Sequence, residues 1–361
     1  MFSGQLPNRF LNALKAINIA TIHPRTFFRH QKKYLHHAVN NVWLTQRNNL
    51  FASLQGSEVI IGGDGRCDSM GHSAKYGSYT GVDLVRNKVL TVELVQSTQV
   101  KSSNNMELKG LQMMFHILSQ FNIVVKALVT DRHKQIAKWV RENMPGVKHY
   151  YDCWHVAKSI KKKLQNLAKK KPCSLVGEWT KSVINHFYWC VQSTEPGNKV
   201  LVEAKWKSLL NHVQNKHEHD GIYPKCLHQP LTEYQARLTK WFKPDTEAYD
   251  SLAKIVDKKD LVKDISQCSA YGQTSTVEGY HSLVNQFAPK MYHFHFHGMH
   301  SRLLLAALHY NENSGRPQKR NHEGKLEFVI TYPKYKEGGH IVRKILTDCS
   351  YNYVDSLFVY Y

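Results

Sequence analysis

The amino-acid sequence predicts an α/β protein whose elements follow the order β-β-β-α-β-α-β, with a long all-helical insertion after the fifth strand. Three observations support this fold class. Strand-like patterns fill residues 58–96, and helical and buried-strand patterns then alternate over 106–151. Residues 156–270 are long, polar and rich in Lys, Trp and His, without a convincing strand. Such alternation is typical of a sheet covered by helices.

The first 50 residues predict two helices joined by a short linker, with Pro24 opening the second one. Five basic side chains lie in that second helix: Arg25, Arg29, His30, Lys32 and Lys33. A basic second helix fits a helix-turn-helix unit that reads DNA in the major groove. A helical hairpin that only caps the next domain is the alternative, because basic helix faces are often simply solvated.

The expected strands and helices of the sheet layer come in a regular sequence. Strands are predicted at 59–63, 79–85, 88–96, 123–129 and 147–151, and helices at 106–121 and 134–143. The fourth and fifth strands are expected to run parallel to the first, since helices separate them.

Downstream of the insertion, the pattern predicts a helix that carries Glu278 and ends at Pro289, then an apolar helix over 301–311. Strand-prone stretches follow at 328–332 and 340–346. The predicted domain organisation begins with a helix-turn-helix-like region at 1–54 and the first part of the α/β domain at 55–155. The helical insertion follows at 156–270, the last helices of the α/β domain at 271–315 and a basic tail at 316–361.

Composition narrows the class of partner. A formal net charge of +21 and a pI of about 9.6 describe a surface that attracts a polyanion, so nucleic acid is expected. A hydrophobic fraction of 42% is sufficient for a real core. Seven cysteines, an odd number, fit reduced thiols better than a disulfide framework. No apolar run is long enough to span a bilayer, so we expect no membrane association. Reduced thiols and a nucleic-acid partner fit a nuclear location.

Three carboxylates form the main functional signal. Asp64 and Asp131 each close a short apolar strand, and Glu278 stands near the start of a helix far downstream. Phosphodiester cleavage or strand transfer is catalysed by two Mg²⁺ ions about 3.5–4 Å apart, and Mg²⁺ prefers hard oxygen ligands. Nearby glycines would let a phosphate backbone approach: Gly62, Gly63 and Gly65.

Each carboxylate also has a structural interpretation. Asp64 can be a turn residue, with Asp68 as the first ligand instead. Asp131 can cap the helix that follows it. Glu278 stands three residues after Ser275, which satisfies the Ser-x-x-Glu capping box. The order of the three on this pattern of elements favours the metal site.

These motifs carry a family resemblance. Gly63-Asp-Gly-Arg-Cys-Asp-Ser69, Thr130-Asp-Arg-His133 and Asp152-x-x-His155 precede the helical insertion, and the Glu278 helix follows it. Over residues 55–315 the chain resembles eukaryotic cut-and-paste DDE transposases with an RNase H-like catalytic domain, nearest to the assemblage of Kolobok, Mutator, P and hAT elements.

The resemblance implies that Asp64, Asp131 and Glu278 bind Mg²⁺ or Mn²⁺. It implies that His155 lies beside the site and contacts DNA or the scissile phosphate. His281, one turn after Glu278, would share the same helix face. The expected partner is double-stranded DNA, with the chain assembled on it as a homo-oligomer.

Histidines and cysteines suggest further sites. The insertion contains a set that can form a structural Zn²⁺ site, with Cys226 and His228 as its central pair: His186, Cys190, His212, His217, Cys226 and His228. Chance clustering is the alternative among 22 histidines. Further on, His293, His295 and His297 alternate with phenylalanines, which places them on one side of an extended segment as a metal site or a DNA-facing loop.

Two functions follow from these features. The first is a transposase or transposase-derived enzyme that cleaves and joins DNA with bound metal ions. The second is a catalytically silent, domesticated protein that keeps the fold and the basic surface for DNA binding. Retention of all three carboxylates favours the enzyme, because anionic groups that face phosphate do not help binding alone.

Overall fold

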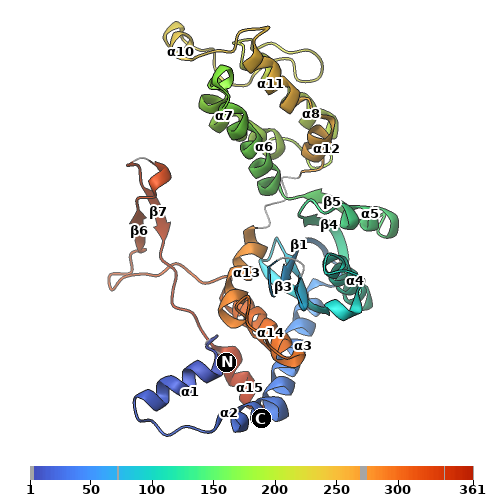
Figure 1. Ribbon diagram of the computed structural model, residues 1–361, viewed down its shortest axis with the longest axis vertical. Helices are drawn as coiled ribbons and strands as arrows, with labels where there is room; N and C mark the ends of the chain where they lie inside the picture. Colours follow the sequence, from blue (N-terminus) through green and yellow to red (C-terminus); the bar gives the residue numbers. More distant parts are fainter. Residues whose placement is uncertain (1–3, 71–72, 269–274, 337, 361) are drawn as a thin grey trace. The chain divides into compact units, whose positions relative to one another are not determined.

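The computed structural model describes residues 4–70, 73–268, 275–336 and 338–360. These residues form two compact units, shown as a ribbon in Figure 1. The first unit comprises residues 1–59, 65–124 and 276–361, and the second comprises 60–64 and 125–275. The predicted domain boundary at 270/271 lies outside the described residues.

A five-stranded mixed sheet is the central element of the described chain, with the strand order β3-β2-β1-β4-β5. Its strands are β1 (Glu58–Cys67), β2 (Tyr76–Asp83), β3 (Lys88–Gln96), β4 (Val124–Thr130) and β5 (Lys148–Tyr151). β2 and β3 form an antiparallel hairpin, whereas β4 and β5 run parallel to each other and to β1. The predicted α/β class is confirmed, and this sheet is consistent with an RNase H-like fold.

The first two strands differ from their predicted limits. β1 continues past Asp64 to Cys67, although Gly-Asp-Gly reads as a turn. The extension is stabilised because Arg66 is buried and donates hydrogen bonds to Asn285 Oδ1 (2.8 Å) and to the carbonyl of Ala288 (2.7 Å). β2 begins at Tyr76, three residues before the predicted start, because contacts within the sheet outweigh the low strand propensity of Gly and Ser.

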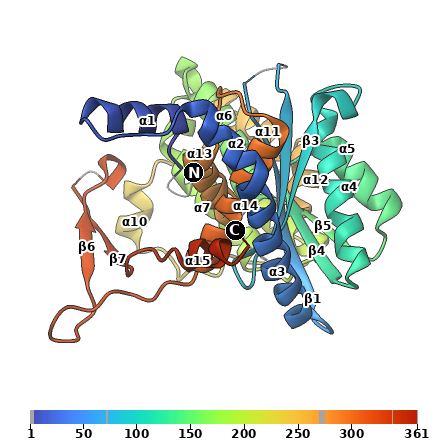
Figure 2. The same cartoon turned by 90° about the horizontal axis from the view of Figure 1, so that it is seen from below.

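Helices cover both faces of the β2–β3 hairpin in the first unit. On one face, Gly110 of α4 (Asn105–Gln120) packs so closely on Tyr79 that a Cβ at Gly110 would lie 2.3 Å from the Tyr79 Cβ. On the other face, Tyr76, Val92 and Leu94 share a core with α3 (His36–Leu54), α13 (Ser275–Phe287) and α14 (Phe296–Asn313). Figure 2 shows α3 and α4 beside the strands.

The N-terminal residues of this unit are helical, as predicted. α1 (Pro7–Ala16) is followed by α2 (Pro24–His30), which continues through a π-helical turn (Gln31–Leu35) into α3. Since Val39, Val42 and Trp43 of α3 are buried against the sheet, the helix that begins at Pro24 forms part of the core of its unit. The basic side chains of α2 precede this buried section.

The remaining elements complete the first unit, and the last of them contributes Tyr353 and Leu357 to this core. A short helical turn (Ser97–Gln99) follows β3, and the C-terminal residues form β6 (Phe328–Thr331), a turn (Lys334–Lys336), β7 (Ile341–Lys344) and α15 (Asn352–Phe358). β6 and β7 lie in the stretches predicted to be strand-prone, and they pair antiparallel. Within the described residues, no helix combines the length and apolar character that crossing a membrane requires.

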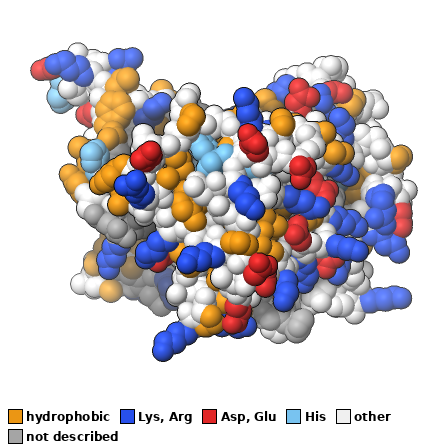
Figure 3. Space-filling model, turned by 90° about the horizontal axis from the view of Figure 1, so that it is seen from above, with side chains coloured by type: hydrophobic (Ala, Val, Ile, Leu, Met, Phe, Trp, Pro, Cys, Tyr) orange, Lys and Arg blue, Asp and Glu red, His pale blue; other side chains and the backbone are white. Residues whose placement is uncertain are grey.

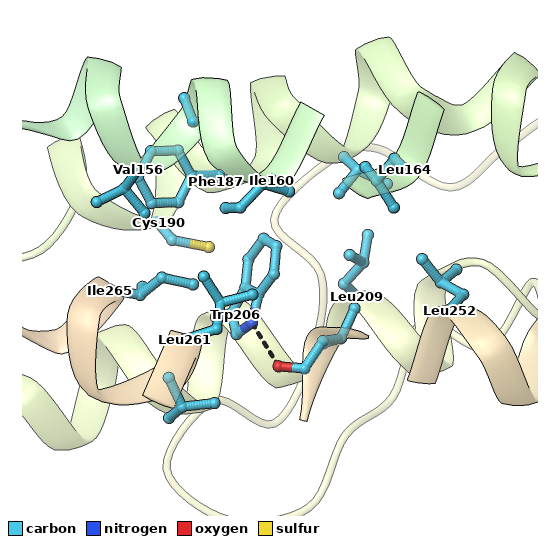
Figure 4. Close-up of a cluster of buried hydrophobic side chains, with 14 of the residues drawn as sticks. Val156, Ile160, Leu164, Phe187, Cys190, Trp206, Leu209, Leu252, Leu261 and Ile265 are labelled. Atoms are coloured by element: carbon cyan, nitrogen blue, oxygen red, sulfur yellow. Dashed lines mark hydrogen bonds between the residues drawn. The ribbon is translucent and has the colours of Figure 1, made fainter. Parts of the chain in front are cut away.

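In the second unit, the segment after β5 is helical, as predicted. The elements that accompany β4 and β5 are α5 (Lys134–Asn143), α6 (Cys153–Ala168), a turn (Lys171–Cys173), α7 (Leu175–Gln192), α8 (Lys199–Lys207), α9 (Leu209–His212), α10 (Glu233–Leu238), α11 (Glu247–Val256) and α12 (Lys259–Ser266). Figure 4 shows how Trp206 fills the centre of this helical core. Its indole Nε1 donates to the carbonyl of Val256 (3.0 Å), so Trp206 joins α8 to the end of α11.

Candidate functional site

Two acidic side chains and a histidine meet in the second unit, where β4 and β5 end. Asp131 follows β4, and Asp152 and His155 follow β5, so adjacent parallel strands bring the three residues to one edge of the sheet. Their potential ligand atoms all lie within 4.8 Å of one another. The histidine Nδ1 is 2.8 Å from Asp131 Oδ1 and 3.5 Å from Asp152 Oδ2. This arrangement is a candidate metal site.

The structure distinguishes the roles of the two aspartates. Asp152 is 1% exposed and caps α6, because its Oδ1 accepts a hydrogen bond from the backbone N–H of Trp154 (2.8 Å). Asp131 does not cap α5, since the side chain of His133 takes that position and accepts from Ile136 N. The capping interpretation of Asp131 is therefore wrong, and its carboxylate instead faces His155.

The two carboxylates alter the protonation of the histidine between them. Asp131 first, and then Asp152, raise the pKa of His155 to about 10, although partial burial opposes them. The imidazole is therefore cationic at neutral pH when no metal ion is bound. The segment after β4 is held from the other side as well, because Arg132 forms an ion pair with Asp264 of α12.

Asp64 belongs to the same unit as this cluster. It lies in β1, which is the sheet neighbour of β4, and its side chain is partly exposed. Asp64 is not a member of the three-residue group. Asp68 belongs to the other unit, where its Oδ1 accepts from the backbone N–H of Lys75 (3.1 Å) across the connection between β1 and β2. Asp68 thus has a local structural role.

Gly65 has a packing role that the sequence did not indicate. A Cβ at this position would lie 2.6 Å from Cγ of Glu107, which is in the first turn of α4. The space beside Gly65 is therefore occupied by a side chain of the protein. A phosphate backbone would therefore have to reach this glycine from another side, and its approach stays a prediction.

Glu278 lies in the first turn of α13 in the first unit and is exposed. The described part of α13 begins at Ser275. His281 follows one turn later and is partly buried, with its ring 5.8 Å from the ring of Tyr280. That Glu278 binds a metal ion together with Asp64 and Asp131 stays a prediction from the sequence.

A second group of metal-ligand side chains lies elsewhere in the second unit. It contains four of the six residues proposed from sequence, and their potential ligand atoms also lie within 4.8 Å of one another: His212, His217, Cys226 and His228. The other two, His186 and Cys190, are not in this group. His186 Nε2 lies 2.8 Å from the carbonyl of Lys205, and Cys190 is buried in the helical core.

The first unit contains a cavity of about 1070 Å³ between its N-terminal helices and the segment before α14. Five cationic and three aromatic side chains line it: Arg9, Arg25, Arg29, Lys32, Arg302, Phe28, Tyr292 and Phe294. Among the described residues, no Asp or Glu lines this cavity. We call it the cationic pocket.

Histidines also line the cationic pocket: His36, His293, His295 and His297. The extended arrangement predicted for the last three applies only in part, because α14 begins at Phe296 and His297 lies within it. Burial and neighbouring cationic groups lower the pKa of His36 to about 4. On the face of the molecule shown in Figure 3, Lys and Arg side chains are spread among acidic and apolar ones.

No protein-family model matches the chain, and no curated protein resembles it significantly in sequence. The class that the structure defines is an α/β protein with an RNase H-compatible mixed sheet and an Asp-Asp-His cluster at its edge.

Proposed function

We propose that this protein is a DNA transposase, or an enzyme derived from one, that cleaves and joins DNA strands with the help of divalent metal ions. The observation that carries the proposal is the group of Asp131, Asp152 and His155 where two parallel strands end, with Asp64 on the neighbouring strand. Functional residues concentrate at this edge in open α/β sheets.

The donor set suits a hard cation. Asp131 and Asp64 offer carboxylate oxygens, which Mg²⁺ and Mn²⁺ prefer, and neither caps a helix among the described elements. Glu278 is the third ligand that the sequence predicts. A bound divalent ion would activate the attacking oxygen and neutralise charge on the leaving oxygen. Asp152 is a less suitable ligand, because its carboxylate is buried and caps α6.

His155 has a positioning role in this proposal. Its Nδ1 atom lies next to both carboxylates and restrains the Asp131 side chain. The Nε2 atom is on the other edge of the ring and would donate a hydrogen bond to a phosphate oxygen of DNA. Asp152 fixes the start of α6 and therefore the place from which the histidine extends.

The cationic pocket of the first unit supports DNA as the substrate. Its five Lys and Arg side chains would neutralise backbone phosphates, and its aromatic rings would stack on bases. The pocket also favours a second candidate function, DNA binding without catalysis, because it makes no use of the metal-site residues.

The test is nicking of a labelled DNA duplex by the purified chain in Mg²⁺ or Mn²⁺. Wild type is compared with the Asp64→Asn/Asp131→Asn double variant, and Asp260→Asn serves as a control because Asp260 is an exposed aspartate of the same unit. We expect metal-dependent cleavage by wild type and the control, and none by the double variant. If wild type binds the duplex in a salt-sensitive manner but cleaves it in neither Mg²⁺ nor Mn²⁺, the result would support the catalytically silent DNA-binding protein.

Two further variants refine the assignment. Asp68→Asn should retain cleavage if Asp64 is the first ligand, whereas loss of cleavage with an intact fold would transfer that role to Asp68. His155→Gln should slow cleavage and shift its pH profile, with a much smaller loss of duplex affinity, because it removes one hydrogen bond to a phosphate oxygen. An unchanged rate and pH profile would remove His155 from the mechanism.

A further inference from the structure

The end of α9 and the segment that connects it to α10 contain a set of metal-ligand side chains that the proposed cleavage does not use. His212 ends α9, and His217, Cys226 and His228 come from the segment that follows. Their potential ligand atoms lie within 4.8 Å of one another. We propose that these four side chains bind one structural Zn²⁺ ion.

The distances fit a tetrahedral zinc ion. With Zn–S of about 2.3 Å and Zn–N of about 2.0–2.1 Å, a sulfur and a nitrogen ligand stand about 3.5 Å apart. Cys226 Sγ lies 3.5 Å from His212 Nδ1. The rings of His212, His217 and His228 have centroids 4.8 to 5.3 Å apart and meet at steep angles, so they converge without stacking.

Hydrogen bonds at the far ring nitrogens orient two of the histidines. His228 Nδ1 lies 2.7 Å from the carbonyl of Gln229, so Nδ1 carries the proton and Nε2 is left as a ligand. His217 Nε2 lies 3.1 Å from Asn215 Oδ1. The other ring nitrogen of His217, Nδ1, is buried and has no hydrogen-bond partner among the described residues, as expected for an atom that faces a cation.

The surroundings of the cluster match those of a structural metal site. Trp241 borders His212 and His217 with ring centroids 6.2 and 6.1 Å away, and Trp179 borders His212 at 6.1 Å. Both tryptophans are held by hydrogen bonds from Nε1 to backbone carbonyls. An apolar shell of this kind limits solvent access to the ion.

The segment also needs an added stabilising element. Residues 213–232 contain no helix or strand. Val213 and Tyr223 are the buried apolar side chains of this segment, whereas Ile222 and Leu227 are 57% and 70% exposed, so few apolar contacts hold it in place. A metal ion bound by His217, Cys226 and His228 of this segment and by His212 of α9 would hold the segment against the helix, as metals do in small domains. Four protein ligands leave no open position, so the site is structural rather than catalytic.

Sulfur and imidazole select zinc rather than magnesium. Mg²⁺ requires oxygen ligands, whereas one thiolate with three imidazoles suits Zn²⁺ and Co²⁺. The zinc site is therefore independent of the carboxylate site and does not rest on the proposed function. It is tested without DNA and without Mg²⁺.

The experiment is elemental analysis of the full chain after purification and dialysis in metal-free buffer. Wild type should retain one zinc per chain, and Cys226→Ala and His228→Asn should retain much less. Cys349→Ser and His322→Asn are matched controls at exposed positions outside the cluster and should keep the ion.

Cobalt provides a second readout that identifies the ligand. Chain reconstituted with Co²⁺ should show thiolate-to-cobalt charge-transfer absorption, and Cys226→Ala should abolish it. Because the His228 side chain is exposed, His228→Asn should fold even if Cys226→Ala does not, and it should weaken zinc binding at least about tenfold. A wild-type chain that binds neither ion, or ligand variants that keep one zinc per chain, would overturn the proposal.

Discussion

Glu93 on β3 should make the stability of the protein depend on pH. The residue is 8% exposed, and the positive charge of Arg47 in α3 acts on its carboxylate. Burial raises the pKa of the carboxyl from 4.5 to about 7, and Arg47 only partly opposes this effect. The folded protein therefore binds the proton more tightly than the unfolded chain does.

The sign and size of the effect follow from linkage. Because the folded pKa is higher, the stabilising contribution is fully present below about pH 4.5 and is lost as pH rises to about 7. The shift from 4.5 to about 7 corresponds to about 3 kcal/mol at about 1.4 kcal/mol per pH unit. Glu93→Gln keeps a neutral side chain of the same shape at every pH and should remove this loss.

Melting temperatures of wild type and Glu93→Gln, measured from pH 4 to pH 8, test this reasoning. The two proteins should melt nearly together at pH 4, and the variant should melt about 5–10 °C higher at pH 8. Glu195→Gln changes an exposed glutamate and is the control, which should follow wild type throughout. A Glu93→Gln protein that is less stable than wild type at pH 8 would show that the ionised carboxylate stabilises the fold through Arg47.

Two further predictions concern packing. Gly110→Ala should destabilise the first unit by about 1–3 kcal/mol, because the new Cβ would lie 2.3 Å from the Tyr79 Cβ. Gly279 lies in a helix, and a Cβ there would meet no atom within 4 Å, so Gly279→Ala should instead stabilise the unit by up to about 1 kcal/mol. Equal changes in the free energy of urea unfolding for the two variants would contradict the packing argument. Trp206→Ala should cost about 3–5 kcal/mol, since the side chain is fully buried and donates to Val256. Urea unfolding followed by helical circular dichroism checks it, and a loss below about 1 kcal/mol would show that Trp206 is not central to the core.

Local patterns were sufficient for much of the fold. The predicted limits of β3 and α5 match the structure, because each has a clear apolar period between turn residues. The end of β1 was missed for a non-local reason. Arg66 looks solvent-facing in sequence, but Asn285 and Ala288, far along the chain, bury and bond it.

The candidate metal site was predictable in part. Asp131 was identified because it closes an apolar strand, and His155 because the Asp-x-x-His motif after the fifth strand resembles that of DDE transposases. Parallel strands bring the two residues to one edge of the sheet. The sequence did not show which residue near each strand end caps the following helix and which is left to face the metal site. Only the structure shows that His133 caps α5 and that Asp152 caps α6, because capping depends on backbone angles.

The histidine and cysteine cluster shows the same limit. Cys226 and His228 were recognised as a pair because they stand two residues apart. The spacing to His212 and His217 matches no standard zinc finger, so the membership of these two depended on how the segment after α9 turns back. The exclusion of Cys190 followed from its burial in the helical core, which only the packing of α7 reveals.

The central claim, a metal-dependent DNA-cleaving site at Asp131, is tested most directly by measuring duplex cleavage and duplex affinity together for wild type and Asp131→Asn in Mg²⁺ and Mn²⁺. The account predicts that cleavage falls at least about a hundredfold, since several kcal/mol of metal-derived stabilisation is removed. Affinity should stay the same or increase, because one negative charge is lost near phosphate. Equal cleavage by both proteins would contradict the account.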